Sequence, residues 1–203
     1  MKALILVDIQ NDFLPGGPLA VPMGDQVVPV ANRLMSQYDV VVATQDWHPA
    51  NHCSFASQHD GHKPGDVIEL GSVTQILWPD HCIQGTRGAD FAPGLDMAGV
   101  HWICHKGTDP GIDSYSGFFD NGRLKQTGLS DYLRKRGVRE VHIIGLATDY
   151  CVKFTALDAR ELGFETHLIL EGVRGVELHP GDCTKAIEEM RAAGVRVVTA
   201  AAA

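Results

Sequence analysis

The sequence lacks the features of several common protein classes. Its five cysteines are irregularly spaced and include no C-x-x-C pair, which argues against a disulfide framework or a thiolate zinc site and favours a reducing, cytoplasmic compartment. No apolar run approaches the roughly 18 residues of a membrane span, and the run at residues 3–7 is too short for a signal sequence. Positive charge is scarce, and the net charge of −8 predicts that neither nucleic acid nor a membrane is a partner.

Linkers, low-complexity segments and internal repeats are also missing, so we expect one domain over residues 1–203. Six short apolar runs rich in β-branched residues recur along the chain. Several are apolar throughout, as expected of strands buried on both faces of a parallel sheet. The runs are residues 3–7, 40–43, 100–104, 141–144, 166–170 and 195–199.

Helical patterns separate most of these runs. The expected helices are residues 27–37, 131–136, 153–162 and 183–193. Ser130 and Asp182 are the predicted N-caps of the second and the fourth, and a glycine follows each of the last three helices. Strands that alternate with helices predict one doubly wound α/β domain, a parallel sheet with helices on both faces.

Polar residues follow the expected strands. Asp8 comes after the first run, Asp46 and His48 after the second, and Lys106 after the third. Because ligands of open α/β sheets bind outside the carboxyl ends of the strands, we expect these side chains to converge. Two long connections, residues 47–96 and 107–127, start at the same edge, and loops of that length in a compact domain are usually functional.

Cys151 lies where the fourth expected strand turns into a helix. A helix N-terminus offers free N–H groups and partial positive charge, which should lower the pKa of the thiol and could hold an oxyanion. Asp8 could accept and return the thiol proton, and Lys106 could stabilise the thiolate. The alternative is structural: Cys151 as a small buried apolar residue, Asp8 as a cap and Lys106 as a surface residue.

A second group has the composition of a metal site. The candidate ligands are Asp46, His48, His52 and His81. Mixed nitrogen and oxygen ligands suit zinc, manganese or iron, whereas loop histidines that merely form hydrogen bonds are the alternative. His59 and His62 lie nearby, and composition alone does not choose among the histidines.

Three aromatic residues lie in loops near the strand ends and could sandwich a flat ring, although ordinary loop packing explains each as well. They are Phe13, Trp78 and Tyr115.

Six motifs, in order over nearly the whole chain, carry a family resemblance. They are residues 7–13 (VDIQNDF), 45–52 (QDWHPANH), 78–82 (WPDHC), 105–107 (HKG), 113–118 (DSYSGF) and 145–151 (GLATDYC). Together they resemble the bacterial nicotinamidases, of pyrazinamidase type, among the isochorismatase-like cysteine hydrolases. The resemblance implies a three-layer α/β/α fold with a six-stranded parallel sheet.

The resemblance also implies roles for individual residues. Cys151 would be the nucleophile, Asp8 the general base and then acid, and Lys106 the third catalytic residue. The backbone N–H groups of Ala147 and Cys151 would form the oxyanion hole, and the peptide bond between Leu146 and Ala147 would be cis.

By the same resemblance, four residues match ligands of one divalent metal ion, most simply zinc, with manganese or iron as alternatives. They are Asp46, His48, His52 and His81. The ion would bind the ring nitrogen of a pyridine substrate, and Phe13, Trp78 and Tyr115 match positions that pack against the ring. His59 and His62 match no ligand position.

We therefore expect hydrolysis of nicotinamide to nicotinate and ammonia, a reaction of NAD salvage, with pyrazinamide as a further substrate. One alternative is another amidase or isochorismatase-type hydrolase on this fold, which would generally lack the four metal ligands. A second is a non-catalytic binding protein, which would have lost one of the three catalytic residues. Motifs leave open which metal is bound and whether the protein is a monomer or a homo-oligomer.

Overall fold

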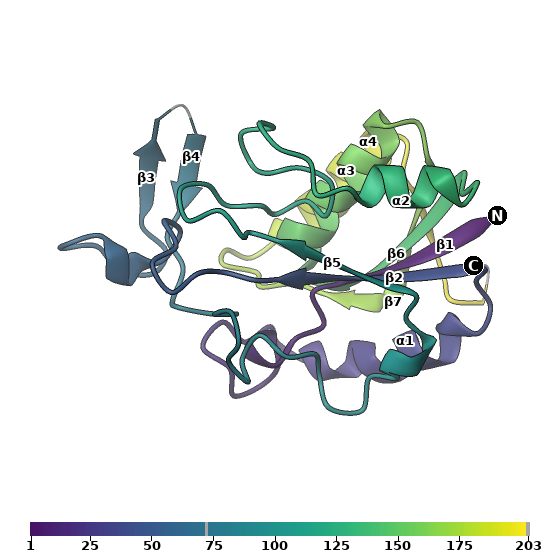
Figure 1. Cartoon of the computed structure of the whole chain (residues 1–203), viewed down its shortest axis with the longest axis horizontal. Helices are drawn as coiled ribbons and strands as arrows, with labels where there is room; N and C mark the ends of the chain where they lie inside the picture. Colours follow the sequence, from purple (N-terminus) through teal and green to yellow (C-terminus); the bar gives the residue numbers. More distant parts are fainter. Residues whose placement is uncertain (72, 202–203) are drawn as a thin grey trace.

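The computed structural model describes residues 1–71 and 73–201 and contains the predicted six-stranded parallel sheet (Figure 1). The strand order is β5-β2-β1-β6-β7-β8, so β1 lies in the middle. The strands are β1 (Lys2–Val7), β2 (Val40–Asp46), β5 (Trp102–Lys106), β6 (Glu140–Leu146), β7 (Glu165–Arg174) and β8 (Arg196–Val198). All six predicted apolar runs lie in or overlap these strands.

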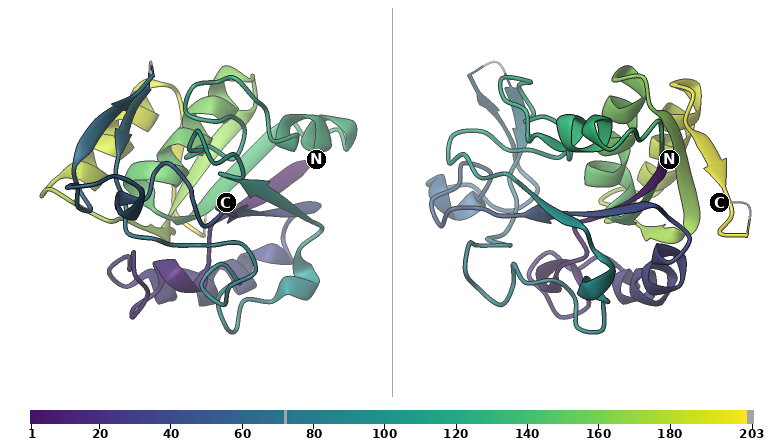
Figure 2. Two further views of the ribbon diagram at one scale, coloured as in Figure 1. Left: turned by 60° about the vertical axis from the view of Figure 1, so that its left-hand side comes forward. Right: turned by 45° about the vertical axis from the view of Figure 1, so that its right-hand side comes forward.

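Helices cover both faces of the sheet, as predicted. α1 (Val27–Met35) lies on one face, and α2 (Leu129–Lys135), α3 (Lys153–Glu161) and α4 (Asp182–Ala192) lie on the other (Figures 1 and 2). The central strand β1 shows why its sequence is apolar throughout. Ala3 and Ile5 pack into the core under α2, α3 and α4, whereas Leu4 and Leu6 pack into the core under α1.

Both predicted helix caps are wrong. α2 begins after Gly128 and α4 after Gly181, two glycines with φ of 91° and 96°. Ser130 is therefore inside α2, and Asp182 is the first residue of α4. A left-handed residue reverses the chain immediately before each helix, and glycine takes that conformation without a steric penalty. Side chains ahead of the helices accept hydrogen bonds from N–H groups of the first turns: Thr127 from Leu129 in α2, and Glu177 from Cys183 in α4.

The segment after β6 also differs from the expected start of an α-helix. Thr148–Val152 forms one π-helical turn, and α3 follows from Lys153. Cys151 lies inside this turn, directly between the sheet and α3. π-helical turns are rare and occur often at functional sites.

A β-hairpin within the 47–96 connection was not predicted. β3 (Val67–Leu70) and β4 (Val73–Ile76) pair in antiparallel fashion and project beyond the carboxyl ends of the main strands (Figure 1). Both strands are short and largely outside the core, so they lack a long apolar run. The hairpin directs one buried side chain, Gln75, toward Asp113 and Tyr115.

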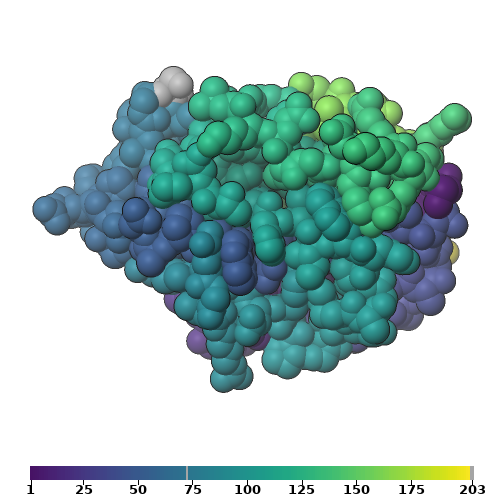
Figure 3. All heavy atoms as spheres, in the orientation of Figure 1, coloured from purple at the N-terminus to yellow at the C-terminus, as the bar shows by residue number. Residues whose placement is uncertain are grey.

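The two long connections meet beyond the carboxyl ends of β2 and β5. The N–H of Cys53 in the first donates to the carbonyl of Pro110 in the second, at 2.8 Å. Their blue and teal surfaces adjoin in the space-filling view (Figure 3). Across residues 1–71 and 73–201, no helix has the length and apolar character needed to cross a lipid bilayer.

Candidate active site

Lys106 is the centre of the site. It is the last residue of β5, paired in register with Asp46, the last residue of β2, and only 2% of it is exposed. Its ammonium nitrogen lies 2.9 Å from Asp8 Oδ2, 2.9 Å from Asp46 Oδ1 and 3.4 Å from the Sγ of Cys151. It also donates to the carbonyl oxygen of Ser114 at 2.9 Å. The structure thus brings the three predicted catalytic residues together.

The charge of Lys106 is set by its neighbours. Burial alone would lower the pKa of this lysine, but the carboxylates of Asp46 and Asp8 outweigh burial and raise the pKa well above its usual value. A buried ion pair withstands the loss of solvation only when it is closely paired and hydrogen-bonded, as here. Lys106 is therefore a permanent ammonium group between two carboxylates.

Asp8 follows β1 directly and has a left-handed backbone conformation, with φ of 46°. Its Oδ1 accepts a hydrogen bond from the hydroxyl of Thr44 at 2.6 Å. Burial raises the pKa of the Asp8 carboxyl, and Lys106 and Thr44 act in the opposite direction. A carboxyl group with a raised pKa is suited to accept a proton and return it.

The thiol of Cys151 differs from the expectation. Burial raises its pKa well above the usual value, and the opposing effect of Lys106 does not cancel this. Asp8, Asp46 and Asp113 add negative potential that disfavours a thiolate. The pKa of this thiol is thus raised, and the prediction of a lowered pKa is wrong. The thiol keeps its proton until a base accepts it, and Asp8 is joined to it through Lys106.

The turn that carries Cys151 is shaped by close contact between strands. A Cβ on Gly145 would lie 2.1 Å from the carbonyl oxygen of Val7, so only glycine fits between β6 and β1. The peptide bond between Leu146 and Ala147 is cis, as the resemblance implies. The carbonyl of Ala147 accepts hydrogen bonds from the N–H groups of Tyr150 and Val152, which fixes the π-helical turn.

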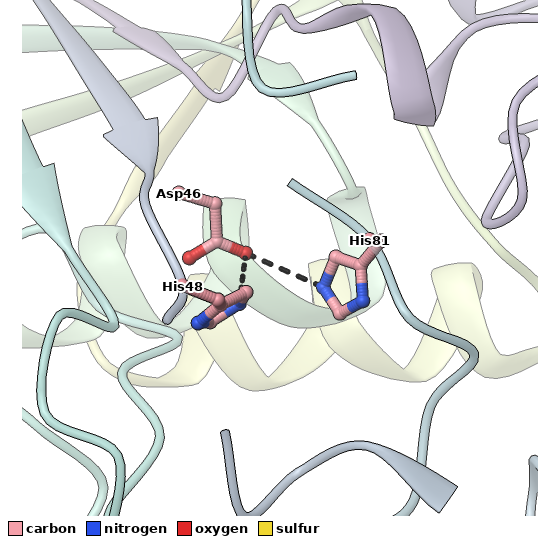
Figure 4. A group of neighbouring side chains, drawn as sticks. All are labelled: Asp46, His48 and His81. Carbon is pink, nitrogen blue, oxygen red and sulfur yellow. Dashed lines mark ion pairs between the residues drawn. The ribbon is translucent and has the colours of Figure 1, made fainter. Parts of the chain in front are cut away.

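Asp46 and two histidines form a compact group of metal-ligand type beside Lys106 (Figure 4). Asp46 Oδ2 lies 3.0 Å from His48 Nε2 and 3.5 Å from His81 Nε2. The opposite ring nitrogens are tied to carbonyl oxygens: His48 Nδ1 to Gly107 at 2.8 Å and His81 Nδ1 to Pro79 at 2.7 Å. Such outer hydrogen bonds place the proton on Nδ1 and leave Nε2 free to bind a metal.

His52 lies next to His48 but outside this group. The two rings are 4.0 Å apart, yet the metal-ligand group that contains His52 consists of His48, His52 and Asp113. The structure therefore brings together three of the four predicted ligands, Asp46, His48 and His81, and places His52 beside His48. Burial, with the adjacent His48, lowers the pKa of His52 to about 4, so its imidazole is neutral.

These residues fit a divalent metal ion. The Nε2 atoms of His48 and His52 are buried and have no hydrogen-bond partner within the part of the chain that the structure describes. Burial lowers the pKa of His48, but the Asp46 carboxylate outweighs it and the pKa rises, so this pair favours a positive charge between its atoms. A divalent ion would supply that charge and use the free nitrogens.

His59 and His62 do not take part. His59 Nε2 lies 2.7 Å from the carbonyl oxygen of Cys53, and His62 is exposed and pairs with Asp66 at 3.3 Å. Leaving both out of the predicted ligand set agrees with this placement.

A pocket opens onto Cys151, Asp46 and His81. The three predicted ring-packing residues line it: Phe13, Trp78 and Tyr115. The Nε1 of Trp78 donates to the hydroxyl of Tyr115 at 3.0 Å, which locks the two rings together. A larger open groove adjoins Tyr115, but neither Cys151 nor the metal-ligand group lines it.

Sequence reasoning missed four residues that line the pocket. They are Leu19, Asp113, Tyr150 and Val176. The ring of Tyr150 meets that of Trp78 edge-on at 4.9 Å and forms a further aromatic wall. The sequence did contain a signal for Asp113 and Tyr150, because both lie inside motifs that also contain predicted site residues. Leu19 and Val176 carry no such signal.

The comparisons with known proteins agree with this geometry. Residues 2–202 match the model of the isochorismatase domain family. The nicotinamidase of Escherichia coli K12 is 52% identical over 204 residues, which cover 98% of this chain and 95% of that protein.

Two solved structures are similar to this one. A nicotinamidase and pyrazinamidase of Acinetobacter baumannii superposes with a TM-score of 0.96 at 44% identity, covering 99% of this chain and 97% of that one. A pyrazinamidase of Pyrococcus horikoshii in complex with zinc superposes with a TM-score of 0.79 at 40% identity, covering 98% of each chain. The chain therefore belongs to the isochorismatase family and, within it, to the nicotinamidases.

Proposed function

We propose that this chain hydrolyses nicotinamide to nicotinate and ammonia through a thioester on Cys151. The observation that carries the proposal is the position of Lys106, whose ammonium contacts Asp8, Cys151 and Asp46. One side chain thereby joins the nucleophile and its base to the metal-ligand group. Cys151 and two members of the metal-ligand group, Asp46 and His81, line a single pocket. The chemistry that attacks an amide and the chemistry that recognises a ring nitrogen lie side by side.

The reaction begins with transfer of the Cys151 proton to Asp8 as the sulfur attacks the carboxamide carbon. The raised pKa of the thiol makes this transfer necessary, and the raised pKa of Asp8 makes it feasible. Lys106 stabilises the charge that develops on sulfur. The backbone N–H groups of Ala147 and Cys151 form the oxyanion hole for the tetrahedral intermediate.

The intermediate collapses when Asp8 returns its proton to the departing nitrogen. Ammonia leaves, and the acyl group remains on Cys151 as a thioester. Asp8, again a carboxylate, accepts a proton from water as the water attacks the thioester carbon. Nicotinate is released, and the proton returns from Asp8 to the Cys151 sulfur.

Recognition of the substrate combines ring packing with a metal contact. Phe13, Trp78 and Tyr115 enclose the pyridine ring, and their packing holds its carboxamide toward Cys151. Asp46, His48, His52 and His81 would hold one divalent ion, most simply zinc, with manganese and iron as alternatives, and a free coordination position would take the ring nitrogen. The zinc complex of the Pyrococcus relative supports this choice.

Several further properties follow from the same proposal. Pyrazinamide shares the ring nitrogen and the carboxamide, so it is a second substrate. The reaction places the protein in NAD salvage, in the cytoplasm. The net charge of −8 supports the absence of a nucleic-acid or membrane partner.

The test is ammonia release from nicotinamide by Cys151→Ala, with Cys183→Ala as the matched control. Cys183 lies in α4, outside the residues that line the pocket. We expect Cys151→Ala to lose turnover while its metal content stays unchanged, and Cys183→Ala to keep its turnover. An active Cys151→Ala protein would contradict the thioester mechanism.

A further inference from the structure

The opposite edge of the sheet carries a second group of histidines and carboxylates. Glu140 and His142 lie near the amino end of β6, and His167 lies near the amino end of β7. The parallel register places His142 directly beside His167, and their rings stack with centroids 4.4 Å apart at an angle of 10°. This group is far from Cys151 along β6, because Cys151 follows the carboxyl end of that strand.

The ligand atoms of this group lie close together. One nitrogen from each histidine and one oxygen of Glu140 all lie within 4.8 Å of one another. Glu140 Oε1 is 2.7 Å from His142 Nε2 and 3.9 Å from His167 Nε2. A second carboxylate, Glu165, places its Oε1 3.5 Å from His167 Nε2. Glu140 and the two imidazoles thus lie close enough together to share one ion, and Glu165 adjoins them through His167.

Burial distinguishes this group from an ordinary surface cluster. His142 is 1% exposed and His167 is 8% exposed, whereas the side chains of Glu140 and Glu165 are 34% and 48% exposed. The histidines form the floor of the group, and the carboxylates form a rim that solvent reaches. An ion could therefore enter from solvent and meet nitrogen ligands below.

His167 supplies an independent observation that points to a ligand. Both of its ring nitrogens are shielded from solvent, and neither has a hydrogen-bond partner among the residues that the structure describes. Leaving a buried polar group unpaired is unfavourable, so a ligand for these nitrogens would be stabilising. His142 is better held, because its Nδ1 lies 2.8 Å from the hydroxyl of Tyr38 and its Nε2 faces Glu140. The hydrogen bond between Tyr38 and His142 Nδ1 is of the kind that orients a metal-binding histidine.

We propose that Glu140, His142 and His167, with Glu165 at the rim, form a second cation site for a divalent transition metal such as zinc, cobalt or nickel. Imidazole nitrogens combined with carboxylate oxygens suit these ions, whereas magnesium and calcium prefer oxygen ligands throughout.

Neighbouring positive charges set the expected strength of this site. Arg196 contacts Glu165 at 2.6 Å, and the ammonium of Lys2 lies over the ring of Tyr38 at 4.9 Å. Both reduce the negative potential that an arriving cation meets. We therefore expect weaker binding here than at the ligands around Asp46.

The test is equilibrium dialysis of the zinc-loaded protein against cobalt at mildly alkaline pH, with zinc and cobalt counted together by atomic emission. We expect wild type to hold one more ion per chain than His167→Gln, and the variant to keep full activity toward nicotinamide. Glu140→Gln is the second variant, and it should lose the same ion. His179→Gln is the control, because the side chain of His179 is 82% exposed and outside the group.

Two results would overturn the proposal. One is an equal number of ions in wild type and His167→Gln. The other is a second ion that persists in both His167→Gln and Glu140→Gln, which would place it elsewhere on the chain. Retained activity in each variant shows that the fold and the active site are intact, so a loss of metal cannot be attributed to unfolding.

Discussion

The two edges of the sheet use the same residue types in different surroundings. At the carboxyl edge, Lys106 is buried between Asp8 and Asp46, and long connections cover all three. At the amino edge, the carboxylates of Glu140 and Glu165 stay partly exposed, because the segments that enter β2, β6, β7 and β8 there are short. Long loops therefore convert charged strand ends into a closed site, while short turns leave them open to solvent.

Among the variants that test this contrast between the two edges, Lys106→Met should have the largest effect. It removes the ammonium that contacts both Asp8 and Asp46 and leaves these two buried carboxylates without their shared partner. We expect the free energy of unfolding to fall by about 3–5 kcal/mol and turnover to fall by about 10²–10⁴-fold. Urea denaturation and ammonia release measure the two effects.

The matched control is Lys125→Met, which removes an exposed lysine that pairs with Asp109 at the protein surface. No change in stability beyond experimental error is expected there, because exposed ion pairs contribute little. If both variants lost equal stability, the contrast between buried and exposed lysines would be wrong.

Gly107→Ala tests the support of the metal ligands. A Cβ at this position would lie 2.4 Å from Cε1 of His48, and the backbone φ of 62° also disfavours any other residue. We expect metal affinity to fall by about 10–100-fold, as is typical when an outer contact of a ligand is disturbed. Equilibrium dialysis with zinc measures it.

Gly111→Ala is the control in the same loop, since a Cβ there meets nothing closer than 3.5 Å. Unchanged zinc affinity in Gly107→Ala would show that the position of His48 does not depend on the backbone beneath it.

Thr44→Val tests the charge balance around Asp8 through pH. The hydroxyl of Thr44 donates to Asp8 and lowers the pKa of that carboxyl, so its removal raises the pKa further. Asp8 must be ionised to accept a proton, and the acid limb of the kcat/KM profile should therefore move to higher pH.

Thr166→Val is the matched control for this measurement. Thr166 is also buried, and its hydroxyl donates to the carbonyl of Phe164, away from the site. An acid limb that stays in place in Thr44→Val, or that moves equally in Thr166→Val, would contradict the assignment of Asp8 as the base.

The smallest effect is expected at the amino edge. Tyr38→Phe removes the hydrogen bond to His142, which should lower the free energy of unfolding by about 1 kcal/mol. Activity toward nicotinamide should not change, because the catalytic residues lie at the other edge. A marked loss of turnover in Tyr38→Phe would show that the two edges are coupled.

The carboxyl edge was predictable because one rule governs it. Polar residues after consecutive parallel strands meet at one edge, and this brings Asp8, Asp46, Lys106 and Cys151 together without knowledge of side-chain positions. The six-stranded sheet was predictable for a similar reason, since strands buried on both faces are apolar throughout.

The remaining features depend on tertiary contacts that a linear pattern does not contain. Ser130 and Asp182 resemble helix caps, but the left-handed glycines before each helix decide where it begins. The helix N-terminus favours a thiolate at Cys151, yet burial and nearby carboxylates outweigh it. The amino-edge cluster requires the exact register of β6 and β7, which places His142 beside His167.

The most direct test of the central claim compares two amides before and after metal removal and add-back. Benzamide carries the same carboxamide as nicotinamide but lacks the ring nitrogen. We expect chelation to lower kcat/KM for nicotinamide by at least about tenfold, equivalent to about 1.4 kcal/mol, and to leave the slow hydrolysis of benzamide unchanged. Added zinc should restore kcat/KM for nicotinamide and leave the hydrolysis of benzamide unchanged. Equal losses for both amides, or no loss for nicotinamide in protein shown to be free of metal, would contradict the account.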